Sequence, residues 1–207
     1  MSDRFSTGVP VLDRELDGGV PPGTVAALLA EPASQAGLFL AEFADRHETL
    51  YLSAERSPTA VSRELRCSGS PDDLAVTALD RDAPVVDALG YVDQLPDDTL
   101  VVVDPVDSLE RTDPGQYRAF LSELRATVAQ TGGIAVVYGL KHDDAPPQRH
   151  RTEYMADLVF DLRTVADGDG VENRLRVPKF RGGRALTDAL RVSLTDRITV
   201  DTSRDIA

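Results

Sequence analysis

The sequence is poor in lysine, cysteine and tryptophan. Its 207 residues include one cysteine and no tryptophan, and of its 22 basic residues only Lys141 and Lys179 are lysine. A single thiol forms no internal disulfide, and no paired Cys/His spacing indicates zinc, so we expect no metal centre. No apolar run approaches the roughly 18 residues that a membrane span needs, and residues 1–4 do not begin a secretory signal. We therefore expect a cytoplasmic protein without a membrane partner.

Acidic side chains dominate the charge. The chain carries 35 Asp and Glu against 22 Lys and Arg, a formal net charge of −13. This composition is typical of halophiles, where at molar salt a Debye length of about 3 Å screens self-repulsion. An ordinary acidic cytosolic protein is the alternative. The negative charge also argues against a nucleic-acid groove, which needs a basic patch, so DNA is only a secondary candidate partner.

Short apolar runs alternate with amphipathic segments over the first two thirds of the chain. Such runs suit strands of a parallel sheet that is covered on both faces. We expect strands at 25–29, 49–52, 75–78, 100–103 and 134–138, and helices at 36–46, 57–65, 84–95 and 116–130. This alternation predicts a doubly wound, mainly parallel α/β sheet.

The last third changes character, because strand-like runs follow one another through short turns. We expect these strands at 158–165, 174–180, 190–194 and 198–200, as a C-terminal antiparallel extension of the sheet. Residues 142–151 are polar and contain two prolines, which predicts a mobile loop. We expect one domain over residues 1–202 and a frayed tail at 203–207.

Four segments resemble KaiC and RadA proteins. Residues 6–23 resemble the start of their RecA-like core, and residues 51–58 (YLSAERSP) are similar to the KaiC segment YVSFEESP. Residues 100–104 (LVVVD) resemble a Walker B strand, and residues 179–184 (KFRGGR) resemble a KxRGSxH turn. The segments occur in the family's order at compatible spacings over nearly the whole chain. The resemblance implies a RecA-like fold of the P-loop NTPase type.

The loop after the first strand is degenerate. A working phosphate loop reads G-x-x-G-x-G-K-[ST], and the aligned residues here are Ala30, Glu31, Pro32, Ala33, Ser34, Gln35, Ala36 and Gly37. The lysine position is Ala36 and the Ser/Thr position is Gly37. We expect Gln35 to reach into the phosphate concavity, and Glu31 to repel a phosphate by about 4 kcal/mol. The helix N-terminus would attract the phosphate by only roughly 0.3–2 kcal/mol, so neither ATP nor Mg²⁺ is expected as a cofactor.

The other candidate residues each allow two interpretations. The resemblance to KaiC and RadA proteins implies that Asp104 holds Mg²⁺ through water and that Glu55 is a catalytic base. Alternatively, Asp104 caps the turn that follows the strand. Arg56 replaces the second family glutamate, which makes Glu55–Arg56 a candidate ion pair.

Several basic residues are candidates for contacts with other molecules. Lys179 and Arg181 resemble residues that reach the nucleotide of a neighbouring KaiC-like subunit, and with Arg184 they are interface candidates or part of a solvated turn. The basic residues at 149–151 either contact DNA or a partner, or lie in a solvated loop.

These observations predict a catalytically inactive KaiC/RadA-like domain, a pseudo-ATPase that acts as a regulatory or assembly scaffold. Its partner would be a paralogous RecA-like subunit or a second copy. One alternative is a weak ATPase that acts at a subunit interface through Asp104, Glu55 and a neighbour's Arg181. Another is an accessory protein of DNA recombination that resembles RadA paralogues.

Overall fold

The computed structural model describes residues 4–68, 73–167, 170–195 and 197–200. Within these described residues, nine strands form one sheet in the order β3-β2-β4-β5-β1-β6-β7-β8-β9. Strands β3 to β6 in this order pair in parallel, and β6 to β9 pair antiparallel. The predicted fold class, with its C-terminal antiparallel extension, is confirmed.

The helices and strands have the following bounds. The helices are α1 (Pro10–Glu15), α2 (Ala36–Ala44), α3 (Pro58–Ser68), α4 (Pro84–Val92), α5 (Asp107–Glu110), α6 (Pro114–Thr131) and α7 (Arg149–Met155). The strands are β1 (Val25–Ala30), β2 (Thr49–Ser53), β3 (Leu74–Ala78), β4 (Leu100–Asp104), β5 (Ile134–Leu140), β6 (Leu158–Asp167), β7 (Gly170–Phe180), β8 (Leu190–Leu194) and β9 (Ile198–Val200). Among the described residues, no helix is long and apolar enough to cross a membrane.

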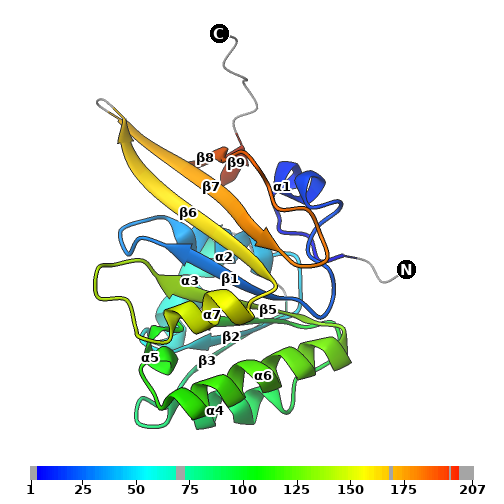
Figure 1. Cartoon of the computed structure of the whole chain (residues 1–207), viewed down its shortest axis with the longest axis vertical. Helices are drawn as coiled ribbons and strands as arrows, with labels where there is room; N and C mark the ends of the chain where they lie inside the picture. The colour runs from blue at the N-terminus through cyan, green and yellow to red at the C-terminus, as the bar shows by residue number, and fades with distance from the viewer. Residues whose placement is uncertain (1–3, 69–72, 168–169, 196, 201–207) are drawn as a thin grey trace.

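Helices cover both faces of the parallel part of the sheet. Alternate residues of β1 point to opposite faces, as the pleat requires, and every residue of this strand is buried. Ala26 and Leu28 join a core with α1, α2 and α3, whereas Ala27 and Leu29 join a second core with α4 and α6. Figure 1 shows α4 and α6 side by side below the sheet.

Local signals account for the ends of the longest helix, α6. Asp113 precedes the helix, and its side chain accepts hydrogen bonds from the backbone N–H groups of Gly115 and Gln116. Pro114 occupies the first turn, where its missing N–H costs nothing. Gly132 ends the helix with φ of 75°, a left-handed conformation that glycine adopts without steric cost.

The prediction of a loop over residues 142–151 is wrong at its C-terminal end. Helix α7 begins at Arg149, and Arg149 is only 8% exposed. The short helices α1, α5 and α7 have four to seven residues, too few to show a helical apolar period. The predicted tail at 203–207 lies outside the described residues.

An aromatic cluster joins the antiparallel extension to the parallel core. Phe160 of β6 is fully buried, and its ring centroid lies 5.3 Å from Phe39 and 6.3 Å from Phe43 on α2. Figure 1 shows that the β6–β7 hairpin extends well beyond the parallel strands. The cluster thus holds the hairpin against the core.

We expect Phe160→Ala to lower the free energy of unfolding by about 3–5 kcal/mol, because it leaves a cavity between the two parts of the sheet. Urea denaturation followed by circular dichroism measures this change. The control Val86→Ala, at a position that is 64% exposed, should change the free energy by less than about 0.5 kcal/mol. An effect of Phe160→Ala as small as the control would contradict the role of the cluster.

Candidate functional site

The strands β1, β2, β4 and β5 end at one edge of the sheet, beside the degenerate loop. The chain leaves β1 into α2 on one face of the sheet and leaves β5 toward α7 on the other. Ligands of open α/β sheets bind at such a reversal of direction, outside the carboxyl ends of the strands. A cavity of about 220 Å³ lies here, which we call the strand-end cavity. The loop contributes Pro32, Ser34 and Gly37 to its wall.

Asp104 lies in this cavity and is already paired. Its side chain is 4% exposed, and its Oδ2 accepts a hydrogen bond from Nη2 of Arg56 over 2.6 Å. The hydroxyl of the buried Tyr51 donates to the same oxygen. Arg56 and Tyr51 therefore satisfy the carboxylate that the Walker B resemblance assigned to Mg²⁺.

Arg56 also binds Glu64 on α3. Its Nη1 donates to Oε2 of Glu64, so one guanidinium joins two carboxylates across the cavity. A Cβ atom added at Gly37 would overlap Oε1 of Glu64. Glu64 thus occupies the space beside Gly37 in which a Ser or Thr hydroxyl would stand in a working phosphate loop.

Glu55 borders the strand-end cavity but makes none of these contacts. Its side chain is exposed, and Arg56 pairs with Asp104 and Glu64 instead of with Glu55. The predicted Glu55–Arg56 ion pair is therefore wrong. The partners of Arg56 escaped prediction because Glu64 and Asp104 lie 8 and 48 positions further along the chain.

The side chains of two residues in the degenerate loop, Glu31 and Gln35, do not lie where the sequence predicts. Oε1 of Glu31 lies 3.3 Å from Nζ of Lys141, and Oε2 accepts a hydrogen bond from the backbone N–H of Thr164 on β6. Gln35 is exposed. Neither residue lines the strand-end cavity. The predicted repulsion by Glu31 and obstruction by Gln35 are thus wrong, and Glu31 instead ties the loop to β6.

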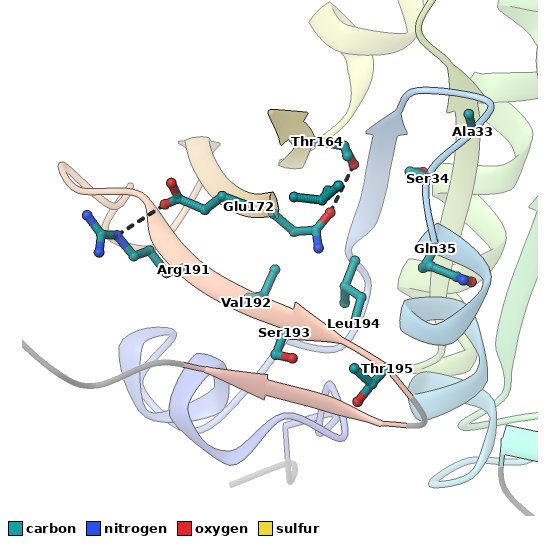
Figure 2. Close-up of a pocket in the computed structure, with 12 residues that line it drawn as sticks. Ala33, Ser34, Gln35, Thr164, Glu172, Arg191, Val192, Ser193, Leu194 and Thr195 are labelled. Carbon is teal, nitrogen blue, oxygen red and sulfur yellow. Dashed lines mark hydrogen bonds and ion pairs between the residues drawn. The ribbon is translucent and has the colours of Figure 1, made fainter. Parts of the chain in front are cut away.

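A second cavity, of about 500 Å³, lies on the outer side of the loop and is drawn in Figure 2. Ala33, Ser34 and Gln35 form one wall, and Val192 to Thr195 form the facing wall. The degenerate loop therefore separates the outer cavity from the strand-end cavity. Of the predicted loop positions, Ala36 is buried at the start of α2.

A buried ion network supports the loop that follows β5. Nε of Arg149 donates to Glu110, which is fully buried, and Nη2 lies 2.9 Å from Oδ1 of Asp107. Nη1 donates to the carbonyl of Leu140, and a Cβ on Gly139 would overlap the guanidinium. Arg149 therefore has a structural role in holding α7. Asp107 and Glu110 were not predicted as part of a site, although two carboxylates soon after a Walker B-like strand indicate a cationic partner.

Lys179 and Arg181 bind the C-terminal end of α7. The ammonium of Lys179 donates to the carbonyls of Glu153 and Tyr154, and Arg181 donates to Tyr154 and Met155. These cations satisfy carbonyls that a helix end leaves unpaired. Both also lie within 6 Å of the Tyr154 ring, which is 74% exposed. Arg184 lies exposed in the turn after β7.

The fold and the position of this site define a RecA-fold domain of the KaiC/RadA type. A crystallised KaiC-like protein of the archaeon Pyrococcus horikoshii superposes with a TM-score of 0.78 over 96% of this chain and 98% of that chain, at 17% sequence identity. A DNA repair protein RadA of Mycolicibacterium smegmatis is 32% identical over 136 residues, which are 63% of this chain and 28% of that protein. A DNA repair protein RadA of Mycobacterium tuberculosis H37Rv is 26% identical over 195 residues, 86% of this chain and 39% of that protein. The chain thus spans well under half the length of these curated relatives.

One family model matches residues 4–207, and the chain belongs to that family, which is described as a family of unknown function, DUF7125.

The Arg56–Asp104 pair can be tested with a double-mutant cycle. Because Asp104 is buried and Arg56 is its cationic partner, we expect Arg56→Met and Asp104→Asn to be coupled by about 1–3 kcal/mol in the free energy of unfolding. Urea denaturation of the four proteins measures the coupling. Arg14→Met, at an exposed position of α1, should change stability by less than about 0.5 kcal/mol. Additive effects of the two substitutions would show that the pair contributes nothing.

Tyr138 on β5 also lines the strand-end cavity, and burial, with a smaller contribution from Asp104, raises its pKa to about 12. The unfolded chain loses the same proton near pH 10. Because the folded pKa is the higher one, this stabilisation is complete below about pH 10 and is lost as the pH rises toward 12. We therefore expect the free energy of unfolding to fall between pH 10 and 12, and to fall less in Tyr138→Phe. Equal slopes in the two proteins would contradict the raised pKa.

Proposed function

We propose that this protein is a non-catalytic KaiC/RadA-like domain that serves as a regulatory or assembly scaffold. The observation that carries the proposal is the pairing of Asp104 with Arg56. A guanidinium 2.6 Å from this carboxylate stands where a metal held by Asp104 would need room and negative charge. In this proposal Arg56 is the cation that balances Asp104, and the site does not bind Mg²⁺.

The degenerate loop supports the same conclusion. Ala36 offers no ammonium to a β- or γ-phosphate, and Gly37 offers no hydroxyl to a metal. A nucleotide that approached Asp104 would first have to displace Arg56, which would leave a buried carboxylate without its charged partner. Removing one partner from a largely buried pair costs roughly 3–5 kcal/mol, and the 38% exposure of Arg56 reduces that cost here.

The partner surface that we propose surrounds the C-terminal end of α7. Lys179, Arg181 and Arg184 bring positive charge to a chain with a net charge of −13, and the exposed Tyr154 lies beside the first two. Aromatic and arginine side chains are enriched at protein interfaces. A paralogous RecA-like subunit or a second acidic copy of this chain would complement this charge.

Two other functions have less support. A weak ATPase acting at a subunit interface would need Asp104 free, whereas Arg56 pairs with Asp104, although Glu55 lines the same cavity. The relatives named DNA repair protein RadA favour a DNA accessory role. However, the buried Arg149 is committed to Glu110 and Asp107, so it offers no cation to a DNA phosphate.

Titration with a fluorescently labelled ATP and excess Mg²⁺ tests the proposal. The titration is done in about 0.15 M and about 2 M KCl, which represent an ordinary and a halophilic salt concentration. We expect no saturable binding below about 1 mM nucleotide and no phosphate release. Micromolar binding that Asp104→Ala weakens, and that the exposed control Asp97→Ala leaves unchanged, would overturn the non-catalytic assignment.

A further inference from the structure

Both lysines of the chain line the same cavity. Lys141 follows β5 and Lys179 lies near the end of β7, yet both border a cavity of about 490 Å³ between β6, α7 and the segment after β5. We call this the basic cavity. It shares no lining residue with the strand-end cavity. Its volume lies within the range of about 300–1,000 Å³ that is common for small-molecule sites.

The charge of the basic cavity opposes that of the chain. Four of its lining residues are Lys or Arg, and only Glu153 and Asp161 are acidic. Over the whole sequence acidic residues outnumber basic ones by 35 to 22. Lys141, Arg149 and Arg163 are each paired with carboxylates, so among the described residues Lys179 is the lining cation that remains for an anion.

The two lysines have different partners. Nζ of Lys141 lies 2.6 Å from Asp161 and 3.3 Å from Glu31, so carboxylates already balance its charge. Among the described residues, Lys179 has no carboxylate within 4 Å and donates only to the carbonyls of Glu153 and Tyr154. Burial and the neighbouring Arg181 lower the pKa of Lys179. An anionic group beside Lys179 would supply the counter-charge that this ammonium lacks.

His142 and several apolar residues complete the wall. Leu29, Val159 and Pro178 line the cavity, and the largely buried Leu29 and Val159 place the apolar area near the sheet. A ligand that fits both parts has an apolar body and an anionic end. Arg149, which Glu110 and Asp107 hold in place, fixes the α7 side of the cavity without a ligand.

We propose that the basic cavity binds a small organic anion, a carboxylate or phosphate ester whose oxygens pair with Lys179 and whose apolar body lies against Leu29 and Val159. This site is separate from the degenerate phosphate loop and does not depend on whether ATP binds there.

Incorporation of lysine labelled with ¹³C at Cε gives a direct probe, because the full chain then carries only two labelled side chains. Phenyl phosphate and benzoate serve as ligands. Inorganic phosphate lacks the apolar body, and benzyl alcohol lacks the charge. We expect phenyl phosphate and benzoate to shift the Lys179 signal saturably, with dissociation constants on the order of 1 mM or below, and both control compounds to bind at least about tenfold more weakly.

Variants locate the binding group. Lys179→Gln should weaken binding of phenyl phosphate by about tenfold or more, measured by calorimetry, and Lys179→Arg should restore most of it because it retains the charge. Arg14→Gln, far from the cavity on α1, should leave binding unchanged. Three outcomes would overturn the proposal: no saturable shift with either ligand, equal binding of inorganic phosphate, or a shift of Lys179 only with single-stranded DNA.

Discussion

The ion pair between Arg56 and Asp104 determines what this RecA-fold domain can do at its strand ends. Asp104 ends β4, the strand that resembles a Walker B strand. Here Arg56, at the end of the neighbouring β2, neutralises that carboxylate and also holds Glu64 against Gly37. The loop lacks the lysine and the hydroxyl of a phosphate loop, and Arg56 neutralises Asp104. We expect both features to weaken the binding of a nucleotide and its metal. Under the proposed function a phosphate meets no lysine in the loop, and the Asp104 carboxylate is not free to hold a metal.

The sequence predicted most of this fold because its strongest signals are local. Apolar runs marked the parallel strands, and the amphipathic segment at 116–130 marked most of α6, which begins two residues earlier at Pro114. Side-chain partners depend instead on contacts between distant segments. Glu31 contacts Thr164, 133 residues away, and Arg149 contacts Glu110, 39 residues away, so both residues received wrong roles from their neighbours in sequence. Short helices such as α7 were missed because one or two turns show no period.

The same edge of the sheet carries two cavities of opposite character. The strand-end cavity is bordered by the bridge from Asp104 through Arg56 to Glu64, whereas the basic cavity contains Lys179, which has no carboxylate within 4 Å among the described residues. Under the proposed function the strand-end site binds no nucleotide, and the basic cavity gives the domain a separate place to bind a small molecule. If the partner surface at the end of α7 is used, Lys179 belongs to both, and occupancy of the basic cavity would then affect assembly.

A crystal structure of the protein crystallised with ATP and Mg²⁺ tests most directly whether the Arg56–Asp104 pair persists and excludes nucleotide. It shows where the Arg56 guanidinium lies when nucleotide is in excess. We expect Nη2 of Arg56 to stay within hydrogen-bond distance of Asp104, and we expect no phosphate in the loop at residues 30–37. Phosphate density in that loop, with Arg56 turned away and a metal beside Asp104, would contradict this expectation.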